Sequence, residues 1–129
     1  MKIKAGRIIE IAGRLETLDG KKLPSGLSYA LIKNKRALKE ELECIFEQRN
    51  SIIKKYCKKD ENGAPVTDNE GRAEFEGEGE IRATEEYASF LDSEIEIDIK
   101  KVGFEEIKKC DSVEPLTVAE MELVEFMLD

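Results

Sequence analysis

Five residues in the first third of the chain have the chemistry to hold a phosphorylated ligand. Arginine grips a phosphate through two parallel hydrogen bonds, lysine adds a point charge, and an aromatic ring stacks on a nucleobase. A helix that begins near Ser25 would add backbone N–H groups at its N-terminus. The residues of this candidate ligand site are Arg7, Arg14, Lys33, Arg36 and Tyr29. One function open to the chain is therefore that of a sponge for a phosphorylated nucleotide signal.

Alternating glutamates in the middle of the chain form a second group. They are Glu74, Glu76, Glu78 and Glu80, and glycines stand between three of them. Carboxylates at this spacing could bind Mg²⁺ or exchange protons, but any sequence this acidic offers such pairs by chance, and a solvated face is the default. The functional alternative is a contact surface for a protein partner, with the acidic run mimicking nucleic acid.

The residues on which many small enzymes rely are missing. The chain has no histidine, which removes the commonest general base and every Ser/His or Cys/His nucleophile pair. Ser51 and Lys54 match a Ser-x-x-Lys spacing, yet the Ser-Asp-Asn and Lys-Thr-Gly motifs of that chemistry are absent. We therefore expect no catalytic residues and a protein that is not an enzyme.

Cysteine and aspartate spacings predict neither a metal site nor another cofactor. Cys44, Cys57 and Cys110 are odd in number and lack a Cys-x-x-Cys motif, so we expect reduced cysteines that fill apolar positions. Asp60 and Asp68 are each followed by a glycine three residues later. That spacing is typical of a turn and does not fit an EF-hand loop.

The formal net charge of −8 is unevenly spread along the chain. Residues 1–39 carry ten Lys/Arg and three Asp/Glu, whereas residues 60–99 carry two Lys/Arg and fourteen Asp/Glu. Such asymmetry can mark an anion-binding face or an acidic mimic. Because opposite charges in one small protein are normally self-complementary or solvated, we expect the two regions to face each other, within the fold or across a homodimer.

Hydrophobic spacing predicts an α+β fold in a single domain, residues 1–129. A long helix from 26 to about 59 carries an apolar stripe that Asn34 and Arg49 interrupt, and a polar break of this kind can fix register in a helix pair. At ~50 Å this helix exceeds the ~28 Å diameter of a compact domain of this length, so it bends or needs a partner. The other expected elements are a shorter N-terminal helix over 3–16 paired with the long one, helices over 81–92, 104–109 and 117–128, a small hairpin over 64–75 and a strand over 94–100.

The sequence predicts no membrane span and no signal peptide. No apolar run approaches the ~20 residues needed to cross a bilayer. Charges interrupt the first seven residues too often for a signal sequence. We therefore expect a cytoplasmic protein.

The layout resembles a group of small uncharacterised proteins encoded in phage and prophage genomes of Gram-positive bacteria. The resemblance rests on QRNSIIKKY at 48–56, KDENGAPV at 59–66, FLDSEIEI at 90–97 and the closing Leu/Met-rich helix. It implies a phage accessory protein that acts inside the host cell on a virion component or on a host protein.

We therefore expect a non-enzymatic phage-type protein that binds and blocks a host or defence component by protein–protein contact. The contact would be the acidic stretch 74–80 or the exposed part of the long helix. Two alternatives stay open: a virion assembly or tail accessory protein that acts as a homo-oligomer, and the nucleotide sponge.

Overall fold

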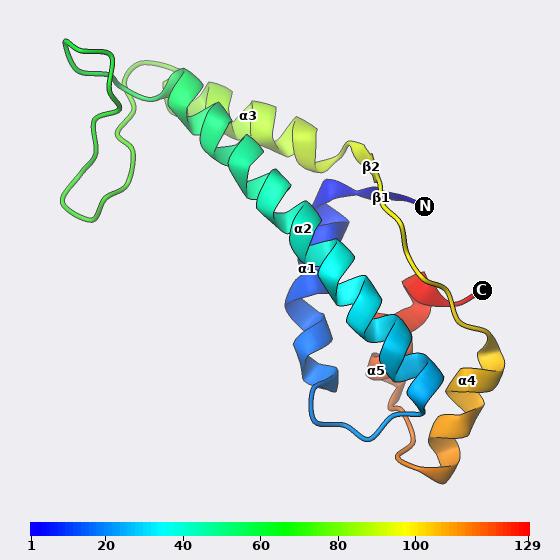
Figure 1. Cartoon of the computed structure of the whole chain (residues 1–129). Coiled ribbons are helices and arrows are strands. Elements are labelled where there is room, and N and C mark those ends of the chain that lie inside the picture. Colours follow the sequence, from blue (N-terminus) through cyan, green and yellow to red (C-terminus); the bar gives the residue numbers. More distant parts are fainter. The chain divides into compact units, whose positions relative to one another are not determined.

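The computed structural model describes residues 1–129 and confirms the α+β class (Figure 1). Five α-helices accompany one two-stranded antiparallel sheet. The chain, predicted as a single domain, forms two compact units that share the long helix α2, Ser25–Tyr56. Unit 1 comprises Met1–Leu42 and Glu94–Asp129, and unit 2 comprises Glu43–Ser93. No helix is both long enough and apolar enough to cross a membrane.

Unit 1 begins with a short strand where the sequence predicted a helix. Strand β1 (Lys2–Lys4) pairs antiparallel with β2 (Glu94–Glu96), with Ile3 opposite Ile95, and helix α1 starts only at Ala5. The predicted strand over 94–100 is likewise shorter, because β1 offers only three residues to pair with. The remaining elements of unit 1 are α1 (Ala5–Arg14), η1 (Leu15–Leu18), residues 25–42 of α2, α4 (Phe104–Lys108), η2 (Lys109–Ser112), α5 (Val118–Val124) and η3 (Glu125–Met127).

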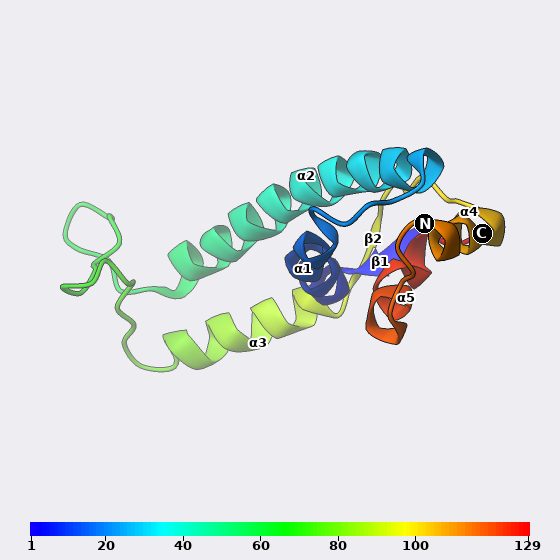
Figure 2. The same ribbon diagram turned by 90° about the horizontal axis from the view of Figure 1, so that it is seen from below.

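The core of unit 1 forms where the apolar faces of its helices meet. Figure 2 shows α1 beneath the first part of α2. Their buried side chains recur at three- and four-residue spacing, as the predicted stripes require. Each fully buried aliphatic side chain contributes about 1.5–3 kcal/mol relative to exposure. The buried residues from α1, α2 and the C-terminal segment include Ile8, Ile11, Leu15, Leu27, Leu31, Leu38, Val124 and Met127.

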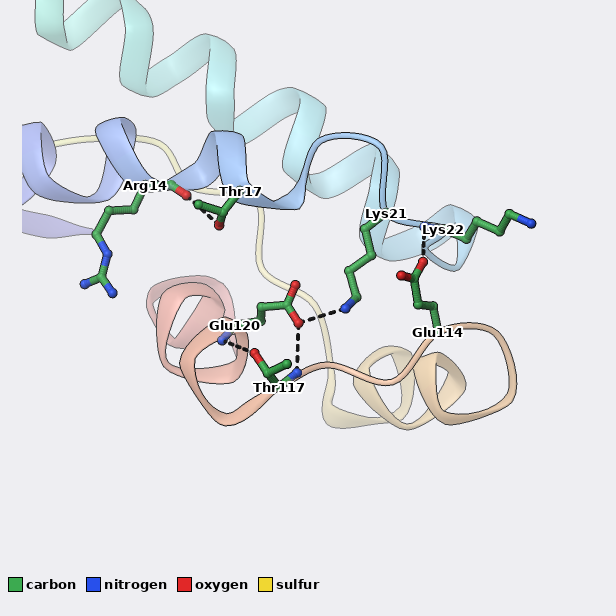
Figure 3. Close-up of polar contacts among 7 residues, drawn as sticks. All are labelled: Arg14, Thr17, Lys21, Lys22, Glu114, Thr117 and Glu120. Atoms are coloured by element: carbon green, nitrogen blue, oxygen red, sulfur yellow. Dashed lines mark hydrogen bonds and ion pairs between the residues drawn. The ribbon is translucent and has the colours of Figure 1, made fainter.

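A capping box and a lysine together fix the start of α5, as Figure 3 shows. The Thr117 hydroxyl accepts a hydrogen bond from the Glu120 backbone N–H, and Glu120 Oε1 accepts one from the Thr117 N–H at 2.8 Å. The same Oε1 lies 2.7 Å from Lys21 Nζ, and these two side chains are only 16% and 12% exposed. The ion pair therefore ties the loop after η1 to a helix about a hundred residues further along the chain.

Unit 2 consists of residues 43–56 of α2, two successive turns and helix α3, Gly79–Leu91. A Cβ at Gly79 would collide with the carbonyl oxygen of Tyr56, so the start of α3 can approach the end of α2 only with glycine there. Cys57 is buried, as is Cys110 of unit 1, but Cys44 is exposed. The expectation that all three cysteines fill apolar positions is therefore wrong for Cys44.

The segment between α2 and α3 contains an eight-residue repeat. Asp60 Oδ1 accepts the backbone N–H groups of residues 62 and 64, and Asp68 Oδ1 accepts those of residues 70 and 72. Gly63 and Gly71 close the two turns with φ of 80° and 81°, values that favour glycine. Both aspartates thus serve as turn residues, which agrees with the prediction of two turns.

A closed triangle of backbone hydrogen bonds joins the two turns. Lys58 N–H donates to Glu74 O, Val66 N–H to Lys58 O, and Glu74 N–H to Val66 O, at 2.8–2.9 Å. The three residues are eight positions apart, so the triangle follows from the repeat. In place of the predicted hairpin strands over 64–75, the structure has two isolated bridges, Lys59 with Pro65 and Thr67 with Ala73.

The Lys21–Glu120 pair predicts a pH-dependent loss of stability. The hydrogen bond from Lys21 holds the pKa of Glu120 below its ordinary value, with the Thr117 N–H adding to the effect. A lowered folded-state pKa stabilises the fold above the unfolded pKa of about 4.3, and this contribution disappears as pH falls through the folded value. We expect Glu120→Gln to lower the melting temperature at pH 7, and the gap to wild type to close as the pH falls from 7 to values below about 4.3.

Thermal melts of both proteins across this pH range provide the measurement. Glu122→Gln, a change at an exposed position on the same helix, is the matched control and should leave the melting temperature nearly unchanged. A gap between wild type and Glu120→Gln that stays constant with pH would contradict the role given to the ion pair.

Candidate functional site

One exposed stripe of α2 combines aromatic, aliphatic and basic side chains. Tyr29, Ile32, Lys33 and Arg36 have the i, i+3, i+4, i+7 spacing that places residues along one side of a helix. Tyr29 is 53% exposed and Ile32 is 48% exposed, although both belong to residue types that normally bury more of their surface. Lys33 and Arg36 are exposed beside them.

Asn34, the residue after Lys33 on α2, fixes a fifth member of this surface. Its side chain is fully buried and is the one polar side chain in the buried core. Its Nδ2 donates to the Lys100 carbonyl at 2.9 Å, and its Oδ1 accepts from the Lys100 N–H at 2.7 Å. The amide therefore satisfies both backbone groups of Lys100 and holds that residue against α2.

The side chain of Lys100 lies beside the exposed tyrosine. Its Nζ lies 5.8 Å from the centre of the Tyr29 ring, and Lys33 Nζ lies 5.9 Å from the same centre. Both ammonium groups are within the range of a cation–π contact, worth about 0.5–1 kcal/mol at an exposed site. We call Tyr29, Ile32, Lys33, Arg36 and Lys100 the α2 face.

The cations of the α2 face surround a shallow cleft of about 550 Å³. Lys33, Arg36 and Lys100 line it together with Glu40 and Asp98. None of the three cations forms an ion pair within 4 Å, although two carboxylates line the same cleft. The cleft therefore offers three cations that no carboxylate of the chain neutralises by direct contact.

The structure places the predicted ligand-site residues in two groups. Tyr29, Lys33 and Arg36 come together on the α2 face. Arg7 and Arg14 lie on α1 in a separate cleft of about 340 Å³, and both contact Glu10 Oε1, at 3.5 and 3.7 Å. Two more glutamates, 122 and 125, line that cleft, so the arginines of α1 already lie among carboxylates.

The predicted partner-binding glutamates all lie in unit 2. Glu78 forms an ion pair with Arg82 at 3.4 Å. Glu74, Glu76 and Glu80 line a cleft that basic residues of the same unit also line. The acidic run is therefore part of a surface of mixed charge.

Ile32 and Lys100 are the two members of the α2 face that the sequence analysis missed. The alternating pattern of 94–100 put Lys100 on the solvent side but carried no sign of the element beside it. Asn34 was recognised as a polar break that could fix register in a helix pair, but it bonds instead to the extended backbone at Lys100. The sequence signal for such a contact was the position of Asn34 inside an apolar stripe, where a polar side chain needs hydrogen-bond partners.

Removing the Asn34 amide should destabilise the fold, because Asn34→Ala leaves two backbone groups of Lys100 without partners. We expect a loss of about 2–4 kcal/mol in the free energy of unfolding, measured by urea denaturation. Gln48→Ala, at an exposed position of the same helix, should change it by less than about 0.5 kcal/mol. Equal effects of the two substitutions would show that the two hydrogen bonds between Asn34 and the Lys100 backbone do not stabilise the fold.

Comparison with protein-family models, with curated proteins and with solved structures finds no match for this chain. The function is therefore inferred from the surfaces of the chain itself.

Proposed function

We propose that this chain is a non-enzymatic accessory protein that binds and blocks a partner protein. The α2 face is the contact, and the partner presents an acidic surface to it. The observation that carries the proposal is a cleft lined by three unpaired cations, Lys33, Arg36 and Lys100. Two of them, Lys33 and Lys100, lie 5.9 and 5.8 Å from the ring centre of a half-exposed tyrosine.

The composition of the α2 face supports a protein partner. Tyrosine and arginine are enriched among the residues that dominate binding energy at protein interfaces. Tyr29 carries a large contact area on a side chain with few rotatable bonds, and Lys33 and Lys100 restrict it further. Ile32 adds exposed apolar area one turn along the helix. Apolar contact supplies affinity in such an interface, and the cations supply orientation and association rate.

A small phosphorylated ligand is supported less well by the same surface. Glu40 and Asp98 line the cleft with the three cations, and their charges would oppose a phosphate dianion placed there. A protein surface can place its carboxylates against the cations and its neutral groups against Glu40 and Asp98. The sponge function therefore takes second place to protein binding.

The identity of the partner as a host or defence component follows from the resemblance to phage-encoded proteins. The geometry of the α2 face does not bear on this identity. It predicts that the partner is found in the lysate of a Gram-positive host and that binding inhibits the partner.

Charge reversal on the α2 face tests the proposal. Lys100→Glu should weaken retention of the partner from a host lysate at least about tenfold, because it places a carboxylate among the basic residues that face the acidic partner. Lys101→Glu is the matched control, since it makes the same change at the next exposed residue, which does not line the cleft. The readout is quantitative mass spectrometry of proteins retained by wild type and by each variant, at low and at high salt.

Two outcomes would overturn the proposal. One is a set of retained proteins that Lys100→Glu and Lys101→Glu reduce equally, since the cleft would then have no special role. The other is a rise in melting temperature with ATP or another nucleotide that Lys100→Glu removes, since the α2 face would then hold a small phosphorylated ligand.

A further inference from the structure

A cleft of about 920 Å³ in unit 2 lies between α2 and the segment that leads to α3. Side chains from the end of α2 line it, as do residues from the second turn and from the start of α3. The charged residues among them are Arg49, Lys54, Lys58, Asp68, Arg72, Glu74, Glu76 and Glu80.

The two signs of charge in this cleft come from different segments. Arg49, Lys54 and Lys58 belong to α2 and the residues just after it, and we call them the basic side. Glu74 and Glu76 belong to the segment that leads into α3, and Glu80 belongs to the first turn of α3; we call these three the acidic side. Asp68 and Arg72 belong to the second turn, where Asp68 accepts backbone N–H groups and Arg72 pairs with Glu70.

The two sides line one cleft without forming ion pairs. None of the six side chains lies within 4 Å of an opposite charge, whereas other charges in unit 2 do pair, as Lys55 does with Glu86 at 2.9 Å. Both sides are therefore available to charges that come from outside the chain. A partner that fits this cleft must supply carboxylates opposite the basic side and cations opposite the acidic side.

We propose that a second copy of this chain is that partner, docked through a two-fold axis. In such an interface the same patch meets itself, so that residue i of one copy contacts residue j of the other and j contacts i. The basic side of each copy then lies opposite the acidic side of its partner, so the six charges of each copy face six opposite charges of the other. A surface with both signs unpaired and segregated meets this requirement with no other molecule.

Apolar residues supply affinity in the same interface. Ile53, Pro65 and Phe75 line the cleft. Phe46, which is 44% exposed, lies on the same side of α2 as Ile53 at a spacing of seven residues. Exposed ion pairs contribute only about 0–1 kcal/mol each, so the charges set the register while the apolar contacts stabilise the dimer.

Paired charge reversals test the proposed dimer more directly than a salt titration does. The net charge of −8 makes two copies repel at low ionic strength while the local ion pairs attract, so a salt titration mixes opposing effects. Variant A carries Lys54→Glu and Lys58→Glu, and variant B carries Glu76→Lys and Glu80→Lys, all four at exposed positions. In variant A both sides are negative or nearly neutral, and in variant B both sides are positive or nearly neutral.

We expect wild type to have about twice the 14.6 kDa chain mass by light scattering coupled to size exclusion. Variants A and B should each be monomers, and an equimolar mixture should form an A–B heterodimer, because each reversed side then faces its reversed counterpart. The heterodimer also shows that both variants are folded. Lys59→Glu combined with Lys101→Glu makes the same net change outside the cleft and should leave the dimer intact.

Three results would overturn this inference. The first is a wild-type protein that is monomeric at every concentration tested. The second is variants A and B that remain dimers, and the third is a mixture in which no heterodimer forms. A monomeric wild type with a melting temperature that falls in both variants would indicate that the two sides close on each other within one chain.

Discussion

The buried amide of Asn34 is the constraint on which the α2 face depends. Burying an amide without partners costs about 1–3 kcal/mol, so the chain must bring a donor and an acceptor to it. The backbone of Lys100 provides both. Two residues later, Val102 N–H donates to Met127 O, and Val102 O accepts from the Asp129 N–H. One short extended segment is thereby fixed to α2 at one residue and to the C-terminal segment at another.

This fixed segment explains why Lys100 has a defined position. An exposed lysine on a free loop would lose about 2 kcal/mol of side-chain entropy on binding a partner. Asn34 fixes the backbone of Lys100, and the ammonium group of Lys100 lies 5.8 Å from the centre of the Tyr29 ring. Part of that side-chain entropy is therefore already lost when the chain folds. Its neighbour Lys101 has the same charge and an exposed side chain, but no contact with the α2 face. The difference between the two lysines comes from backbone hydrogen bonds, which composition does not reveal.

Sequence reasoning predicted the elements better than the contacts between them. The apolar stripes of α1 and α2 depend on residues a few positions apart, so local spacing revealed them. The partner of Asn34 lies 66 positions away, and the helical period carries no sign of it. The eight-residue repeat of Asp60 and Asp68 was visible in the spacing of aspartate and glycine, but the closing triangle through Lys58 was not. Within the candidate ligand site, charge alone did not separate Arg36, which forms no ion pair, from Arg7, which Glu10 contacts.

The two proposed surfaces differ in the sign of their unpaired charges. The unpaired cations of the α2 face line one cleft, so that surface favours a partner of opposite charge. The cleft of unit 2 exposes both signs from separate segments, so it complements a copy of itself. The two surfaces belong to different units and share no residue. A dimer joined through unit 2 carries two α2 faces, and for a partner with two acidic sites that can reach both faces the second contact is intramolecular. Self-association would in this way raise the apparent affinity of a contact that is weak in a single copy.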